Sequence, residues 1–194
     1  RLFGSVGQPG VTALALSPDA DSAVFIERGP PNRLVFLDPT TGAREIIADD
    51  SYGLVAYDSI ARQVVVTDVN LNLSIVDLTS RERRPHSARG IPLDACAHRG
   101  LVLLTSAAPD NTTITAWNFH TGAIAFQLEA ASLQPGALFA TAALTADSHR
   151  LACAIYWEDD TGEHFDVLVR DLETNTELAR FRDLAWVGAL HFSP

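Results

Sequence analysis

Short apolar runs separated by turn-forming residues recur along the whole chain. The runs are rich in Val, Ile, Leu, Phe and Thr and are bounded by Gly, Pro, Asp and Asn, a pattern typical of β-strands. No stretch keeps the apolar spacing of a helix over three turns, so we expect no long helix. The pattern therefore predicts an all-β chain.

Two turn markers recur in a fixed order. One is an Asp or Asn that closes a strand and is followed within four residues by Thr, Ser, Gly or Asn; it occurs at Asp38, Asp77, Asn118 and Asp171, with spacings of 39, 41 and 53 residues. Such side chains bond backbone N–H groups, and Gly or Asn accepts a positive φ. The other marker lies earlier in each repeat, as in Ser17-Pro18-Asp19 and Thr145-Ala146-Asp147, and starts a fifth time at Leu190–Pro194.

Each repeat divides into four expected strands. They span 11–17, 22–28, 33–38 and 43–48; then 53–58, 62–69, 71–77 and 80–85; then 92–98, 100–107, 112–118 and 123–129; and last 139–145, 150–158, 165–171 and 176–182. Four strands in about 40–50 residues is the arithmetic of a propeller blade. We expect blades at about 11–48, 53–85, 92–129 and 139–182, with 1–6 and 187–194 belonging to flanking blades.

The strand types within a repeat differ as the strands of a blade do. The first strand carries small residues such as Ala13 and Ala15, which suit a narrow channel. The second is apolar without alternation, as in Leu101–Leu104, which indicates burial on both faces. The fourth is charged, as in Arg81–Arg84, and charge protects an outer edge strand.

The Ser17-Pro18-Asp19 turn, the Trp117-Asn118 pair and the Asp-x-x-Thr-Gly turns resemble WD-repeat and WD-like β-propellers over nearly the whole chain. Trp-Asp is replaced by other pairs in three repeats, and no Gly-His pair precedes a first strand, so quinoprotein-like and lactonase-like propellers stay open. The expected fold is all-β: a propeller of four-stranded antiparallel blades, with four blades plus flanking strands present. The resemblance implies a ring of about seven blades, with a compact four-bladed ring as the alternative.

Charge and composition narrow the class of partner. The 194 residues include 14 Arg, no Lys and 24 acids, a net charge of −10 that makes nucleic-acid binding unlikely. No apolar run reaches the ~18 residues of a membrane span. Cys96 and Cys153 each lie in an apolar run, so we expect buried reduced thiols rather than a disulfide, and a cytoplasmic or other reducing intracellular compartment.

The loop acids predict one acidic rim. In a propeller, the loops joining second to third strands and those joining blades share one rim. The expected loops carry only three bases but seven acids: Asp49, Asp50, Asp110, Glu158, Asp159, Asp160 and Glu163. These seven are the candidate partner-binding residues, for a protein with a basic or neutral surface.

Two local clusters keep alternative interpretations. The loop Glu158–His164 is either a solvated hairpin or a weak cation site, since hard cations prefer clustered carboxylates. The arginines between Arg81 and Arg89 either protect an outer strand or contact phosphates or an acidic partner.

No catalytic motif is present, and we assign no catalytic, metal or cofactor-binding residue and expect no cofactor. The expected role is a non-enzymatic scaffold for protein–protein interaction within a larger chain or assembly. A propeller enzyme, for which the first strands offer only Asp94 and His191, and a sensor or regulatory domain of a multidomain protein are the alternatives.

Overall fold

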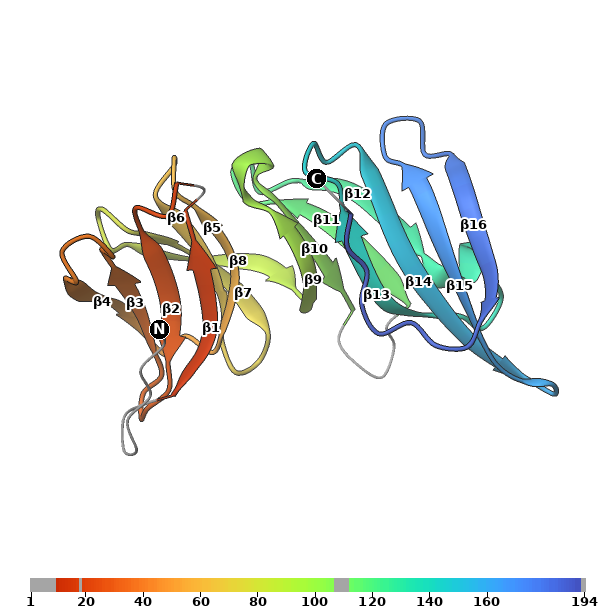
Figure 1. The fold of residues 1–194 in the computed structure, drawn as a ribbon, viewed down its shortest axis with the longest axis horizontal. Coiled ribbons are helices and arrows are strands. Elements are labelled where there is room, and N and C mark those ends of the chain that lie inside the picture. The colour runs from red at the N-terminus through yellow and green to blue at the C-terminus, as the bar shows by residue number, and fades with distance from the viewer. Residues whose placement is uncertain (1–9, 18, 107–111, 193–194) are drawn as a thin grey trace. The chain divides into compact units, whose positions relative to one another are not determined.

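The computed structural model describes residues 10–17, 19–106 and 112–192. The chain divides into two compact units, Arg1–Ala88 and Arg89–Pro194. Each unit contains two four-stranded sheets in which neighbouring strands are consecutive in sequence (Figure 1). This confirms the expected all-β architecture of four-stranded antiparallel blades.

The first unit contains blades 1 and 2. Blade 1 consists of β1 (Val11–Leu16), β2 (Ala23–Glu27), β3 (Arg33–Leu37) and β4 (Arg44–Asp49). Blade 2 consists of β5 (Gly53–Asp58), β6 (Gln63–Thr67), β7 (Asn72–Asp77) and β8 (Arg83–Arg89). Strands β1 and β2 contact β5, so the two sheets meet near their first strands.

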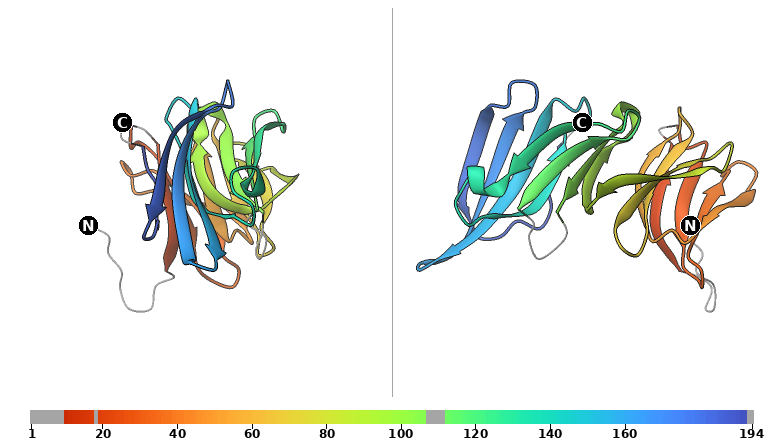
Figure 2. Two further views of the ribbon diagram at one scale, coloured as in Figure 1. Left: turned by 90° about the vertical axis from the view of Figure 1, so that its right-hand side faces the viewer. Right: turned by 180° about the vertical axis from the view of Figure 1, so that it is seen from behind.

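The second unit contains blades 3 and 4, seen from behind in Figure 2. Blade 3 consists of β9 (Ile91–Cys96), β10 (Leu101–Thr105), β11 (Thr113–Asn118) and β12 (Ile124–Glu129), and blade 4 of β13 (Leu138–Leu144), β14 (Arg150–Asp159), β15 (Gly162–Asp171) and β16 (Glu177–Leu184). Two short 3-10 helices, Ala97–Arg99 and Ala130–Ser132, lie in connections. Here β9, β10 and β11 contact β13.

Each unit has its own core between its two sheets. Val24, Leu34, Val64 and Val76 are fully buried in the first unit. Leu103, Ile114, Leu151 and Ile155 are fully buried in the second. The second strand of every blade is buried on both faces and the fourth is largely exposed, as the residue types predicted.

The Asp or Asn marker forms the turn between the third and fourth strands. Asp38 Oδ1 accepts hydrogen bonds from the backbone N–H groups of Thr40 and Thr41, at 2.8 and 3.1 Å. The same scheme recurs at Asp77, Asn118 and Asp171. The fourth residue after each marker has a positive φ, which explains why Gly or Asn occupies three of the four positions: Gly42, Arg81, Gly122 and Asn175.

This turn corrects the expected bounds of β8. The Asp77 N–H donates to Glu82 O at 3.0 Å, so the turn occupies 77–82 and the strand begins at Arg83 rather than residue 80. The strand then continues to Arg89, through the segment expected to be a loop.

The segment after blade 4, expected to belong to a flanking blade, lies in no strand over residues 187–192. Residues 1–6 and 193–194, also assigned to flanking blades, lie outside the described residues.

Polar side chains join neighbouring blades. In the first unit, the Ser22 and Tyr57 hydroxyls lie 2.7 Å apart, and the Arg83 guanidinium on β8 donates to Asp49 O at 3.0 Å. Arg81 forms an ion pair with Glu45. Part of the arginine cluster therefore ties blade 2 to blade 1, a role that the sequence interpretation did not include.

Cys96 and Cys153 are both buried, as expected. Cys153 lies in the core of the second unit, and burial raises the pKa of its thiol to about 12. The Cys96 Sγ lies 3.2 Å from Ala146 O. Both thiols therefore act as packing residues.

Candidate partner-binding site

The longest strands of the described chain, β14 and β15, form a hairpin that extends beyond its sheet. Each strand has ten residues, and their ladder continues to the pairs Glu158↔Glu163 and Asp159↔Gly162. Asp160 and Thr161 form the turn. Figure 1 shows the hairpin projecting at the lower right.

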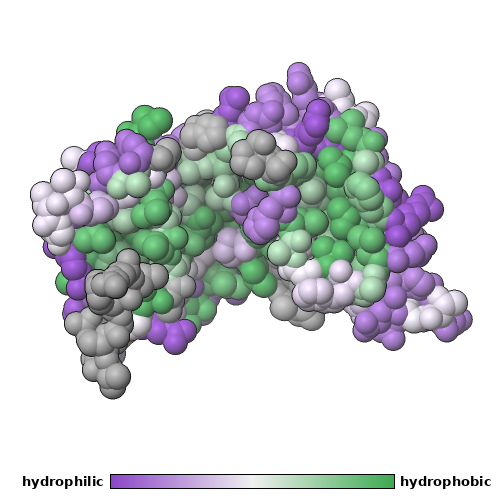
Figure 3. Space-filling view, viewed as in Figure 1, coloured by the Kyte–Doolittle hydropathy of each residue, from purple (hydrophilic) through white to green (hydrophobic). Residues whose placement is uncertain are grey.

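The hairpin tip is acidic and exposed. Glu158, Asp159, Asp160 and Glu163 are all exposed, and no Arg or Lys occurs between residues 151 and 169. Figure 3 shows hydrophilic colours around this projection, beside the apolar face of the same sheet. We define these four side chains as the acidic tip.

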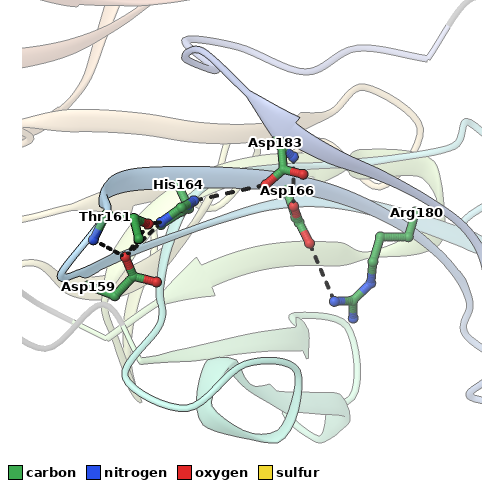
Figure 4. A network of polar contacts seen from close by, with 6 residues as sticks. All are labelled: Asp159, Thr161, His164, Asp166, Arg180 and Asp183. Carbon is green, nitrogen blue, oxygen red and sulfur yellow. Dashed lines mark hydrogen bonds and ion pairs between the residues drawn. The ribbon is translucent and has the colours of Figure 1, made fainter.

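A local network fixes the conformation of the tip (Figure 4). Asp159 Oδ1 accepts hydrogen bonds from the Thr161 backbone N–H at 2.8 Å and from the Thr161 hydroxyl at 2.6 Å. His164 Nε2 lies 3.0 Å from the same oxygen, and the His164 ring stacks on Trp157 with ring centroids 5.1 Å apart. Side-chain hydrogen bonds thus hold the turn that carries the acids.

A second group of polar contacts supports the base of the hairpin. Asp166 is 3% exposed, and its carboxylate lies 3.4 Å from Arg180 Nη1 and accepts a hydrogen bond from the Asp183 N–H at 3.2 Å. Arg180 also pairs with Glu177 at 3.0 Å, and this hydrogen bond is the main cause of the raised pKa of Arg180. Asp183 in turn lies 3.9 Å from His164 Nδ1 (Figure 4).

The structure brings four of the seven predicted partner-binding residues together. These are the acidic tip. Asp49 and Asp50 lie in the other unit, where Asp49 is 3.5 Å from Arg33 Nε. Asp110 lies outside the described residues.

Sequence reasoning missed Trp157 and Asp183. Trp157 supports His164 by stacking, and Asp183 reaches the hairpin from β16. The only available signal for Trp157 was its position next to the acidic run. Asp183 gave none, because its place depends on the pairing of β15 with β16, which is irregular.

For the alternative interpretation of Glu158–His164 as a cation site, the described residues show no set of metal ligands. In 10–17, 19–106 and 112–192, no group of three or more His, Cys, Asp or Glu side chains is arranged to hold a metal ion. Asp159 Oδ1 accepts hydrogen bonds from the Thr161 N–H and hydroxyl.

Asp94, which the sequence analysis named as open to an enzyme, has a structural role. Its Oδ2 accepts a hydrogen bond from the Leu144 N–H at 2.7 Å, and its Oδ1 accepts one from the Ala95 N–H at 2.8 Å. The carboxylate therefore joins β9 of blade 3 to β13 of blade 4. His191 is exposed and lies in no strand.

Acid should loosen the tip. Hydrogen bonds from Thr161 and His164 hold the pKa of Asp159 well below its usual range. A carboxylate with a lowered folded pKa stabilises the fold above its unfolded pKa of ~3.9, and the contribution is lost as the pH falls through the folded pKa. We therefore expect stability to fall on acidification below about pH 4, and less steeply in Asp159→Asn. Urea unfolding at constant ionic strength measures both slopes; equal slopes would contradict this role of Asp159.

Comparisons with known proteins identify the fold class. No family model and no curated protein matches the sequence. Among solved structures the chain is similar to TolB from Acinetobacter baumannii (TM-score 0.61, 18% identity, 87% of this chain and 43% of that one). It is also similar to the dihydro-heme d1 dehydrogenase NirN (0.61, 16%, 90% and 38%) and to a puromycin hydrolase (0.60, 14%, 88% and 28%).

These likenesses show the fold alone. The chain has a β-propeller fold, built of four-stranded antiparallel blades. It spans less than half the length of these three structures. No helix in the described part of the chain is long and apolar enough to cross a membrane.

Proposed function

We propose that this chain is a non-enzymatic, WD-like protein-interaction module whose acidic tip binds a basic surface of a partner protein. The observation that carries the proposal is the β14–β15 hairpin. It carries four acids at a hydrogen-bonded turn, and no Arg or Lys lies between residues 151 and 169.

The electrostatics of the tip favour fast, salt-sensitive recognition. Like charges close together on a projecting turn repel one another, and a partner with Arg or Lys residues relieves that repulsion. The Asp159–Thr161–His164 contacts order the turn before binding, so little conformational entropy is lost on association. A binding module needs this kind of preorganised surface.

Two further observations support an interaction role over catalysis. The Asp94 carboxylate is engaged by two backbone N–H groups, so it is held in a structural role. Cys153 is buried with its pKa raised, which removes it as a nucleophile.

Charge reversal at the tip tests the proposal. Peptides selected by display against the intact chain should be enriched in Lys and Arg, and the selected peptide serves as the probe. Glu158→Lys with Asp160→Lys leaves the Asp159 contacts in place and should weaken binding by about tenfold or more at low salt. Asp159→Lys with Asp160→Lys should weaken it further, and both pairs should reduce the dependence of the affinity on salt.

A control compares the tip with an exposed acid elsewhere in the same blade. Glu173→Lys reverses one exposed acid in the turn after β15, away from the tip, and should leave binding within about twofold. Equal losses in Glu173→Lys and in the tip variants would reject the site. Selection of peptides without basic residues would reject the proposed partner chemistry.

A further inference from the structure

A groove opens between blades 1 and 2 of the first unit, at the end of the blades where β1, β3 and β5 terminate. Its volume is about 440 Å³, within the range of ~300–1,000 Å³ typical of small-ligand sites. One wall comes from blade 1, through the turn after β1 and the turn after β3. The other comes from blade 2, through the end of β5 and the turn that follows it.

One hydrogen bond between the two blades, and two within the turn after β1, hold the floor of the groove. The buried Ser22 and Tyr57 side chains meet there with their hydroxyl oxygens 2.7 Å apart. Asp21 Oδ1 accepts hydrogen bonds from the Ser17 and Ser22 hydroxyls, at 2.8 and 3.1 Å. The floor is therefore preformed, and a ligand need not order it.

Apolar side chains line part of the walls. Ile60 is 88% exposed, more than any other large hydrophobic side chain of the described residues. Phe36 contributes an aromatic ring, and Arg62 lies over that ring with its Cζ 5.5 Å from the centroid. A ligand with an apolar segment would remove the Ile60 side chain from water, which is favourable.

The charged side chains that line the groove favour a cationic ligand. Three carboxylates line the groove, Asp19, Asp21 and Asp38, against the single cation of Arg62. Hydrogen bonds from Ser17 and Thr41 lower the pKa of Asp19 and of Asp38 respectively, so both are ionised at neutral pH. Arg62 is held against Phe36, and the lining keeps a net negative charge.

We propose that this groove binds an arginine or lysine side chain presented by a partner protein. The charged head would meet the carboxylates, while the alkyl stem would cover Ile60 and the edge of Phe36. Arg and Lys side chains combine such a stem with a charged head. The groove lies in the first unit and the acidic tip in the second, so the inference does not depend on the proposed function.

Capped arginine tests the charge requirement on the unmodified chain. We expect Nα-acetyl-arginine methylamide to shift the amide NMR signals of Ser22 and Ile60, with an affinity at least about tenfold above that of the capped citrulline analogue. Citrulline has nearly the same shape without the charge. Equal binding of the two compounds, or shifts confined to other residues, would overturn the proposal.

Variants assign the binding to the groove. Asp19→Asn with Asp21→Asn keeps the hydrogen-bond acceptors and should weaken arginine binding by about fivefold or more, whereas Asp147→Asn in the fourth blade should not. Ile60→Ser should weaken it about threefold, whereas Val69→Ser, another exposed apolar position of the first unit, should not. If the double aspartate variant does not fold, the comparison of Ile60→Ser with Val69→Ser tests the groove. Arginine binding that is weakened only by the acidic-tip variants would contradict the proposal.

A final comparison identifies the source of the cation. A peptide with one central arginine should bind at least as tightly as the capped amino acid and more tightly than agmatine. Tighter binding of agmatine would point to a free organic cation and would overturn the assignment to a partner protein.

Discussion

Replacing Gly90 with alanine is expected to destabilise the second unit by about 2–3 kcal/mol. Gly90 is buried in the connection between β8 and β9, and a Cβ there would lie 2.5 Å from Thr105 O and 3.2 Å from Leu104 Cβ. Both obstacles are close to the backbone of β10, so a strand of the core must move to relieve the overlap. Urea denaturation followed by tryptophan fluorescence measures the loss, since all three tryptophans lie in this unit.

Two other glycines provide controls for Gly90. A Cβ on Gly136 meets nothing within 4 Å, but the φ of Gly136 is +75°, a conformation that alanine adopts only at a cost. Gly136→Ala should therefore lower stability by only about 1 kcal/mol. A Cβ on Gly10 also meets nothing, and Gly10→Ala should be close to neutral. A Gly90→Ala loss no greater than that of Gly136→Ala would show that β10 yields easily.

Removing the Arg180 side chain is expected to cost the second unit about 2–3 kcal/mol, because it leaves the buried Asp166 carboxylate without its cation. The Arg180 side chain is 17% exposed, so solvent screens the pair only weakly. Removal of the Arg180 side chain should also weaken the contacts that order the acidic tip. Asp166 accepts a hydrogen bond from the N–H of Asp183, and Asp183 lies beside His164 (Figure 4).

Two comparisons separate this ion pair from general effects of charge. Arg182→Ala, exposed on the same strand, should change stability by less than about 0.5 kcal/mol. Asp166→Asn combined with Arg180→Ala should recover part of the loss, since no uncompensated charge stays buried. Arg180→Ala with a stability equal to that of Arg182→Ala would mean that the Asp183 N–H alone satisfies Asp166.

The strands and turns could be predicted because their causes are local. Runs such as Leu101–Leu104 are buried whichever residues pack on them, and Asp38 makes its turn with residues two and three positions ahead. Repetition of the same pattern gave the four-stranded blades. The β8 start was missed because Arg81, not Gly or Asn, takes the positive φ in that turn.

The candidate site was only partly predictable, because its parts come from different strands. The acids of the tip stand together in sequence and could be found. The His164–Asp183 and Asp166–Arg180 contacts depend on the register of β15 with β16. The groove beside Ile60 joins two blades, and nothing in the sequence indicates that Asp19 and Arg62 share it.

The hydrogen bonds of Asp94 limit how this fold could be redesigned as a catalyst. An acid on an inner strand is an obvious starting point for engineering general-base chemistry, yet here the amides of Ala95 and Leu144 occupy it. Freeing that carboxylate would leave the Leu144 N–H unbonded at the junction of two sheets. Catalytic residues are better introduced in the turns, where a substitution leaves the hydrogen bond between Asp94 and Leu144 intact.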